Sequence, residues 1–417
     1  MTFRQTLTVV TVIRDGCVEQ LRSLLNARGD TLQTTNPAIP FDAIDTIHMA
    51  RWVMVDGYDK DGRRAPNRLV FCSNYDNLLK DQLSRLSTDA GTALDEIYEL
   101  CEGYPEPANR NPSSRAAYLS QHIVDNDCIF IGTPDRTLVQ IRQENALRIA
   151  MQAYLDKFQT NGKSAREVKA AVRAFVESNP DLSWAKAPAP PRESTWLQVT
   201  LLILAAPILL PFLLLWLLIL RLFFERTDQP QNIKPCDLDP TLAPELERRE
   251  DVAAQSPFSQ LMEIKPGKFR MLTLKGVLWL STYTGRYIFK NGNIMFIPSI
   301  HFYNWLILPE GRLLFFSNFD GSWQSYLGDF IDKAAFGLNG VLSNCVGFPK
   351  TWFLFFKGVH DVEHYKAWAR YANIPTQAWY TAYPTLTVKN INNNSRLRLG
   401  LHEDMTEEKA AKWLRGV

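Results

Sequence analysis

Apolar residues in the first part of the chain follow the spacing of strands and helices in turn. Short β-branched and aromatic runs are separated by loops rich in Gly, Asp and Pro, and the stretches between them have helical periodicity. The resulting order is strand, helix, strand, strand, helix and late strand, which predicts a ferredoxin-like α+β unit. The predicted strands are residues 7–13, 47–55, 69–74, 128–133 and 137–141, and the predicted helices are 17–27 and about 78–100.

A long apolar segment lies in the middle of the chain. No charged residue occurs from Trp196 to Leu220, a stretch of 25 residues. As a helix it would extend roughly 37 Å, enough to cross the roughly 30 Å hydrocarbon core of a bilayer. Pro207 and Pro211 interrupt it, and proline kinks or breaks a helix. The segment is therefore either a kinked single span or a hairpin that enters and leaves on the same side.

The two halves around this segment carry the same motifs in the same order, at offsets of 244 to 253 residues. Five ordered blocks at so constant an offset indicate a duplicated domain rather than a short solenoid repeat. If the two copies pair within one chain, they must lie on the same side of a membrane, which favours the hairpin. The matching blocks are VIRDG and EIKPG, IDTIHMARW and IPSIHFYNW, RLVFCSNYD and RLLFFSNFD, CEGYP and CVGFP, and PDRTLVQIRQENALR and PTLTVKNINNNSRLR.

These features divide the chain into two ferredoxin-like repeats with an inserted membrane segment. Ser164 is the expected N-cap of a helix before the segment, and Thr406 that of a helical tail. A stiff PAPP linker precedes the membrane segment, and a polar, extended tether follows it. The predicted domains are repeat 1 at 1–158, a helix and Pro-rich linker at 159–193, the membrane segment at 194–226, a polar linker at 227–256, repeat 2 at 257–400 and the helical tail at 401–417.

Composition limits the classes of partner and compartment. The formal charge of +2 is nearly balanced, which provides no electrostatic argument for nucleic acid. The six cysteines are scattered without a C-x-x-C pair, which indicates reduced thiols and predicts no structural metal site. The first residues lack a signal-peptide pattern, so a cytoplasmic start is expected. We expect membrane lipid as a partner, and homo-oligomerisation and protein partners are left open.

Two histidines occupy equivalent strand positions and are the leading candidates for chemistry. Strand periodicity places His48 on one face with Trp52, and His301 on one face with Trp305. Either histidine acts as a ligand or an acid/base inside a barrel, or it is a hydrogen-bonded residue that stabilises the fold. Arg51 lies on the opposite face of its strand, and copy two has an asparagine there.

Polar residues that follow the strands provide further candidates. The SNYD and SNFD turns, the second ending at Asp320, are typical of helix caps, or they form a polar site at the strand ends. The run KNINNNSRLR contains Asn392, Asn394 and Arg398, with Arg148 as the match in copy one. Amides beside arginines suit a carboxylate or phosphate head group, although the run also fits a simple helix start. HDVEH at 360–364 matches an inverted-zincin pattern without a third ligand.

The motifs IHFYNW, SNFDGSWQSYLGDFIDKA, VGFP and NINNNSRLR carry a resemblance to a family of bacterial membrane-attached proteins without a settled activity. More distantly, the chain resembles the dimeric α+β barrel superfamily, which includes dye-decolorising peroxidases, chlorite dismutases and small monooxygenases. The strand-KPG-helix opening at 265–267 is similar to the monooxygenase-like members, and FSNFDGS at 316–322 to the peroxidase Asp-Gly motif. The resemblance implies a bacterial inner-membrane location with cytoplasmic domains, and haem as a conceivable cofactor, but no position matches the haem-ligand histidine.

Two functions from different classes agree with these features. The first is a membrane-attached barrel that binds a hydrophobic or lipid-derived ligand, with peroxidase-like or monooxygenase-like redox chemistry as its enzymatic form. Its expected catalytic residues are His48, His301, Arg51 and Asp320, and its expected ligand-binding residues are Trp52, Trp305, Asn392, Asn394, Arg148 and Arg398. The alternative is a non-enzymatic membrane-surface scaffold in which the same side chains only stabilise the fold.

Overall fold

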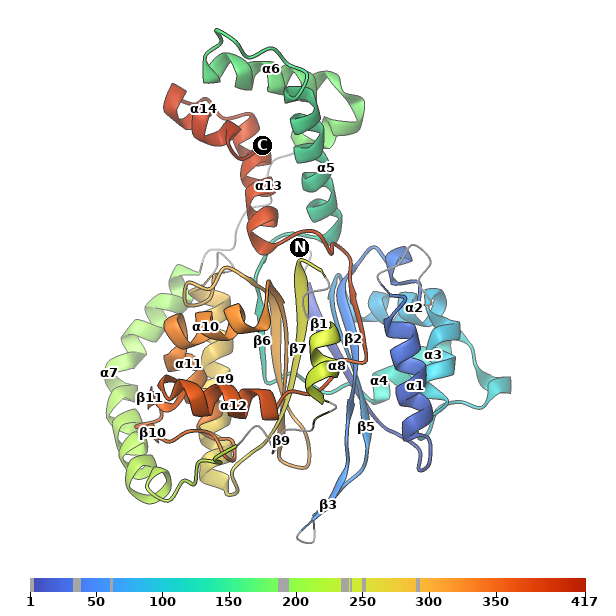
Figure 1. Ribbon diagram of the computed structural model, residues 1–417, viewed down its shortest axis with the longest axis vertical. Helices are drawn as coiled ribbons and strands as arrows, with labels where there is room; N and C mark the ends of the chain where they lie inside the picture. The colour runs from blue at the N-terminus through green and yellow to red at the C-terminus, as the bar shows by residue number, and fades with distance from the viewer. Residues whose placement is uncertain are drawn as a thin grey trace.

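The computed structural model describes residues 4–32, 39–60, 63–186, 195–233, 240, 242–249, 253–289 and 293–417. Two four-stranded antiparallel sheets form the centre of a mixed α+β body, with helices on both outer sides (Figure 1). The first sheet contains β1 (Arg4–Val12), β5 (Arg68–Asp76), β2 (Ile47–Val55) and β12 (Ala378–Thr381). The second contains β7 (Gln255–Glu263), β9 (Arg312–Asp320), β8 (Ile300–Ile307) and β6 (Cys128–Ile131).

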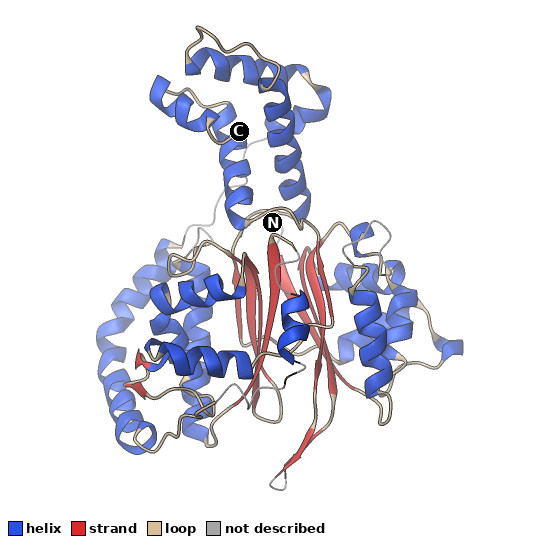
Figure 2. Ribbon diagram, viewed as in Figure 1, coloured by secondary structure: helices blue, strands red, loops and turns tan. Residues whose placement is uncertain are grey.

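The strands of the two sheets lie together at the centre of the body, between the helices (Figure 2). Each half of the chain contributes its last strand to the sheet of the other half. Strand β6 pairs with β8, with Cys128 opposite Trp305, and β12 pairs with β2, with Ala378 opposite Trp52. Gly132 permits the close approach at the end of β6, because a Cβ there would lie 1.7 Å from the carbonyl oxygen of Ile300. Neither sheet is complete without both halves of the chain.

The inner faces of the two sheets pack against each other through a compact apolar cluster. Val53 and Val70 of the first sheet meet Leu306, Leu314 and Phe316 of the second, all fully or almost fully buried. Larger cores lie on the outer faces under the helices, and they are rich in aromatic side chains. Burial of apolar area therefore stabilises each sheet on both faces.

Helices cover the outer faces, and each half of the chain also has a short two-stranded hairpin. Outside the first sheet lie α1 (Val18–Gly29), α2 (Leu79–Asp89), α3 (Gly91–Tyr98) and α4 (Pro112–Gln121), with a β3–β4 hairpin (Tyr58–Lys60, Arg63–Ala65). Outside the second lie α9 (Lys268–Tyr287), α10 (Trp323–Lys333), α11 (Ala335–Leu342) and α12 (Val362–Tyr371), with a β10–β11 hairpin (Thr351–Trp352, Phe356–Lys357).

Four helices project from one end of the body as a separate head (Figure 1). They are α5 (Leu138–Leu155), α6 (Ala165–Ser178), α13 (Val388–Leu401) and α14 (Glu407–Leu414). The predicted late strand at 137–141 is wrong, because these residues begin α5, whose N-cap is Thr137. The predicted caps of the other helices are confirmed, because Ser164 caps α6 in a capping box and Thr406 caps α14.

The apolar segment is one helix, so the favoured hairpin is wrong. Helix α7 (Trp196–Ile219) contains both prolines without interruption, and it continues as a π-helical turn, Leu220–Glu225. It curves along the outer side of α9 in Figure 1, and the prolines bend it without reversing it. The tether after it is not wholly extended, because Leu242–Arg249 forms α8. The PAPP linker lies outside the described residues.

Candidate functional site

The two equivalent histidines lie in one buried polar cluster where the ends of the two sheets meet the head. His48 is on β2 and His301 on β8, and each faces the aspartate that ends the neighbouring strand. Tyr383 follows the exchanged strand β12 and lies between them, 5.8 Å from each histidine ring between ring centres. Strand exchange therefore brings residues from both halves of the chain together.

In the first half of the cluster, Nε2 of His48 lies 3.0 Å from Oδ1 of Asp76, and its Nδ1 lies 3.2 Å from the hydroxyl of Tyr383. The other oxygen of Asp76 accepts the backbone N–H of Leu138, the first residue of α5, at 2.7 Å. The guanidinium of Arg4 lies 3.7 Å from Asp76 and donates to Thr133. One carboxylate thus connects a strand histidine to the start of a head helix.

The second half repeats this arrangement. Nε2 of His301 lies 2.7 Å from Oδ1 of Asp320, whose other oxygen accepts the N–H of Val388, the first residue of α13, at 2.8 Å. Gln255 takes the strand position of Arg4 and donates to the carbonyl oxygens of Tyr383 and Leu386. The prediction that the SNYD and SNFD turns cap the helices that follow them is wrong, because α2 begins after Leu78 without a side-chain cap and α10 is capped by Ser322. The alternative, a polar site at the strand ends, is what the structure has: each aspartate accepts the first N–H of a helix more than 60 residues later.

Burial sets the protonation of the first pair. Desolvation, followed by the positive charge of Arg4, lowers the pKa of His48 to about 4, so the imidazole is neutral at pH 7. Burial raises the pKa of Asp76, but His48, Arg4 and the Leu138 N–H more than offset it, and the pKa lies below its usual value. A charged carboxylate at a helix N-terminus is favourable, so Asp76 stabilises the start of α5.

Several buried polar atoms of the cluster have no hydrogen-bond partner of good geometry among the described residues. They are Nε and Nη2 of Arg4 and Nδ1 of His301. Such atoms are costly unless water or a small ligand satisfies them. Haem does not fit here, because both Nε2 atoms face carboxylates and the His48 ring packs between Phe302 and Tyr383, at centroid distances of 5.7 and 5.8 Å.

Arg51 lies elsewhere and connects the two sheets. Its side chain is buried between them and donates to the carbonyl oxygens of Phe258 and Ser317, at 2.8 and 2.7 Å, and to the side chains of Ser259 and Asn318. Burial lowers the pKa of Arg51 to about 10. All four partners are neutral and lie in the second sheet, which gives Arg51 the geometry of an inter-sheet connection.

The expected ligand-binding tryptophans lie in the two outer cores. Trp52 is fully buried, stacks on Phe41 with ring centroids 5.5 Å apart, and packs at a tilt against Phe71 at 4.6 Å. Trp305 stacks on Phe315 at 4.1 Å. These contacts are those of core packing.

The asparagine-rich run forms α13 and has two faces. On the inner face Asn394 is buried and donates to Asn145, and Arg398 donates to Glu144 at 3.2 Å. Arg148 donates to Gln152 and to the C-terminal carbonyl of Val417. On the outer face Asn392 accepts from Arg136 at 2.9 Å and lines a cleft of about 510 Å³. The structure therefore separates residues that the sequence placed in one group.

The HDVEH motif does not form a metal centre. His364 is exposed, and its Nδ1 lies 2.9 Å from Asp361. In the described part of the chain, no three His, Cys, Asp or Glu side chains converge in a way that would hold a metal ion.

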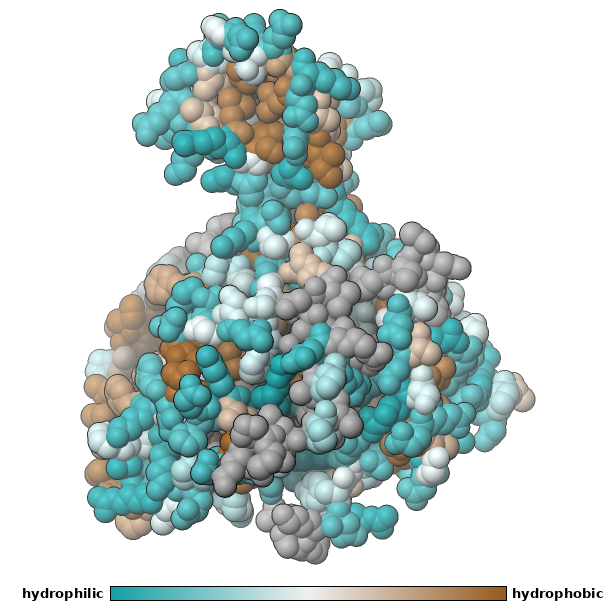
Figure 3. All heavy atoms as spheres, in the orientation of Figure 1, coloured by the Kyte–Doolittle hydropathy of each residue, from teal (hydrophilic) through white to brown (hydrophobic). Residues whose placement is uncertain are grey.

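Helix α7 carries a long run of exposed apolar side chains. Trp196–Glu225 is long and apolar enough to cross a membrane, with a mean hydropathy of 2.8, and none of its most apolar 18-residue window is buried. Ile208 is 67% exposed and Phe212 70%. Figure 3 shows hydrophobic side chains along the edge of the body where α7 lies.

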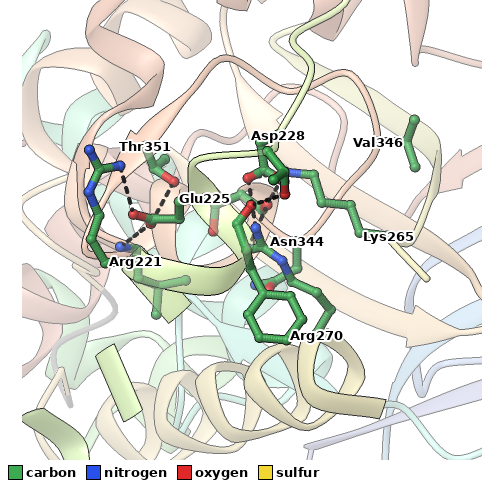
Figure 4. Close-up of polar contacts among 12 residues, drawn as sticks. Arg221, Glu225, Asp228, Lys265, Arg270, Asn344, Val346 and Thr351 are labelled. Atoms are coloured by element: carbon green, nitrogen blue, oxygen red, sulfur yellow. Dashed lines mark hydrogen bonds and ion pairs between the residues drawn. The ribbon is translucent and has the colours of Figure 1, made fainter. Parts of the chain in front are cut away.

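A polar clamp holds the C-terminal end of α7 on the body (Figure 4). The buried carboxylate of Glu225 accepts the hydroxyl of Thr351 and the backbone N–H groups of Phe353 and Leu354, at 2.7 to 3.1 Å. Just beyond it, Asp228 pairs with Lys265 at 2.8 Å and with Arg270 at 2.7 Å. Burial of charge at this clamp is compensated by ion pairs and hydrogen bonds.

Sequence reasoning missed several residues of the polar cluster and of the clamp. Nothing in the sequence indicated Arg4 or Tyr383, because the matching strand position or loop of the other half has a different residue. Asp76 was recognised only as part of a turn. Asp76 and Asp320 occupy equivalent positions in the two halves, as His48 and His301 do. This double match could have predicted the two histidine–aspartate pairs.

No protein-family model matches the chain, and a search of curated proteins gave no significant match.

Proposed function

We propose that this protein is a monotopic membrane-surface scaffold, in which α7 lies in the plane of the bilayer and the two-sheet body carries the helical head. The proposal also takes the two sheets, with their matching strand orders, to be tandem ferredoxin-like repeats. The observation that carries it is that α7 is exposed along its apolar middle while both of its ends are attached to one folded body.

Strand exchange makes this body a single unit on one side of the helix. Strand β6 precedes α7 in sequence and β12 follows it, yet each completes a sheet begun by the other half. If α7 crossed the bilayer, the preceding and following segments would lie on opposite faces. The exchanged strands would then have to separate, with the loss of both sheets.

Contacts along α9 support an orientation parallel to the body surface. At the first end of α7, Thr195 donates to the carbonyl of Tyr287, and Tyr283 donates to the carbonyl of Gln198 at 2.6 Å. At the other end, Trp216 donates to Thr273 at 2.9 Å and stacks on Phe269 at 4.2 Å. These contacts tie the two ends of α7 to opposite ends of α9.

The exposed middle of α7 has the chemistry of a lipid-facing surface. Residues 206–215 are exposed and apolar, and nearby exposed aromatics include Trp196 and Trp279. Aromatic side chains favour the bilayer interface, and buried apolar area drives attachment. On soluble proteins, an exposed apolar patch of this length usually marks a surface that binds a partner or a membrane.

Vesicle flotation of the purified full chain tests this attachment. We expect the protein to float with phosphatidylglycerol–phosphatidylcholine vesicles, and the double variant Ile208→Lys/Phe212→Lys to reduce the floating fraction at least tenfold. Ile149→Lys is the control, because Ile149 is an exposed apolar residue on the head. Unchanged flotation of the double variant would overturn the proposal. A soluble dimer that the double variant dissociates would instead assign α7 to a second copy.

Labelling of reconstituted vesicles separates an in-plane helix from a spanning one. Arg166 precedes α7 and Glu363 follows it, and both are exposed. Cysteine introduced at either position is expected to react with a membrane-impermeant maleimide to the same extent, after subtraction of the parent protein. Reaction of one position, with the other requiring detergent, would show that α7 crosses the bilayer.

A second candidate is redox chemistry on a hydrophobic or lipid-derived ligand, and the unpartnered polar atoms around His48 and His301 favour it. Because haem does not fit between these histidines, this candidate predicts haem-free turnover of a lipid hydroperoxide with an added reductant, and His301→Ala should abolish that turnover. Purified protein that floats with vesicles and shows no such turnover would support the scaffold alone.

A further inference from the structure

We propose that the cleft between α13 and α14 binds the phosphate group of an amphiphilic ligand. The cleft has a volume of about 510 Å³, within the range of small-molecule sites. Four cationic side chains line it against the single carboxylate of Glu403. The cations are Arg136, from the segment before α5, Arg396 of α13, and Lys409 and Lys412 of α14.

Neutral amides orient both guanidinium groups. Arg136 donates to the side-chain oxygen of Asn392 at 2.9 Å, and Arg396 donates to that of Asn393 at 2.6 Å. The amide of Asn393 positions Arg396 without neutralising its charge, whereas the carboxylate of Glu144 holds Arg398 on the inner face. Arginine forks held in this way match the geometry of phosphate oxygens.

An apolar strip lies beside these charges. Leu399 is 47% exposed, and Met405 and Trp413 line the same cleft. Gly400 permits the close approach of α14, because a Cβ there would lie 2.6 Å from the Trp413 ring. Cations next to an apolar strip favour a ligand that has both a phosphate and a hydrocarbon portion.

The duplicated helix α5 shows that the fold does not require this charge. At the 250-residue offset of the last matching block, Ala146 takes the place of Arg396, and Ile149 that of Leu399. The two helices pack against each other, and the hydroxyl of Ser395 on α13 donates to the carboxylate of Glu144 on α5. Arg396 is therefore specific to α13, and a helix in this position does not require it.

Titration calorimetry with soluble probes tests the site without a bilayer, so its outcome is independent of attachment through α7. The probes are inorganic phosphate, dihexanoyl phosphatidate below its critical micelle concentration, and dihexanoyl phosphatidylcholine as a zwitterionic comparison. We expect the phosphatidate to bind, with an affinity that falls as salt is raised. Binding of inorganic phosphate as well would identify a free phosphate as a sufficient ligand, and binding of phosphatidate alone would identify a lipid head group.

Matched variants locate the binding. Arg396→Ala, which copies the residue of α5, and Lys409→Gln/Lys412→Gln are each expected to weaken binding about tenfold or more. Arg166→Gln is the control, because Arg166 is an exposed arginine on α6, outside the cleft. Failure of every phosphate probe to bind the parent protein would overturn the proposal. Equal affinity of the cleft variants and the parent protein would do so too.

Discussion

The neutral, buried state of His48 predicts a specific loss of stability in mild acid. The folded state holds the pKa of His48 near 4, whereas an exposed histidine has a pKa of about 6.5. Between these values the unfolded chain binds a proton that the native protein does not, so the free energy of unfolding falls as pH falls. For one such group the loss is about 2 kcal/mol from pH 7 to pH 5, and about 3 kcal/mol by pH 4.

The charged groups around His48 explain why protonation is resisted. Arg4 of β1 repels the imidazolium, His301 of β8 also disfavours it, and Asp76 of β5 favours it. Tyr383 is placed so that its hydroxyl donates to a neutral imidazole, with Nδ1 as the acceptor. Because desolvation is the largest effect, the single carboxylate does not restore the pKa of His48 to its ordinary value.

Urea denaturation of the parent protein in mild detergent at pH 7 and pH 5 measures this effect, with His48→Gln for comparison. The difference between the two pH values is expected to be about 2 kcal/mol smaller in His48→Gln than in the parent. His364→Gln is the control, because His364 is exposed, and it should behave as the parent does. An equal pH dependence in His48→Gln and the parent would refute the reasoning, as would a His48 imidazole NMR resonance that titrates near pH 6.5.

Three further substitutions, each with its control or readout, test the inter-sheet contacts of Arg51, the close approach at Gly132 and the α7 clamp. Arg51→Ala leaves several buried acceptors of the second sheet without a donor, so we expect the free energy of unfolding, measured by urea denaturation, to fall by about 3 kcal/mol. Asn304→Ala, at the matching position of the other sheet, should lower it by about 1 kcal/mol. Gly132→Ala should destabilise the protein by about 2 kcal/mol or more, because the added Cβ would collide with the backbone carbonyl of Ile300. Gly328→Ala, whose Cβ would lie in open space on α10, should be neutral or stabilising by up to about 1 kcal/mol. Glu225→Ala removes three hydrogen bonds of the α7 clamp, and faster hydrogen exchange of residues 351–354 would be the measured sign; stable protection there would contradict the clamp.

Local signals were sufficient for most elements and for the histidine positions. The alternation of IHMARW and IHFYNW placed His48 and His301 on strands, and Ser164 and Thr406 began helices because their side chains satisfy free N–H groups wherever the helix packs. The strand predicted at 137–141 is wrong because the local pattern is ambiguous: so short an apolar run fits a strand or the start of a helix. Tertiary packing of α5 against α13 selects the helix.

The sequence by itself determined the order of elements, the matching motifs of the two halves and the presence of a long uncharged helix, because each depends on residues close together in the chain. Only the tertiary structure decided that β6 and β12 exchange sheets, since a strand carries the same pattern of apolar residues whichever partner it joins. That exchange brings Tyr383 between His48 and His301, and the fold places Asp76 and Asp320 where each accepts the first N–H group of a distant helix. It also places both ends of α7 on one body, which no hydropathy pattern records.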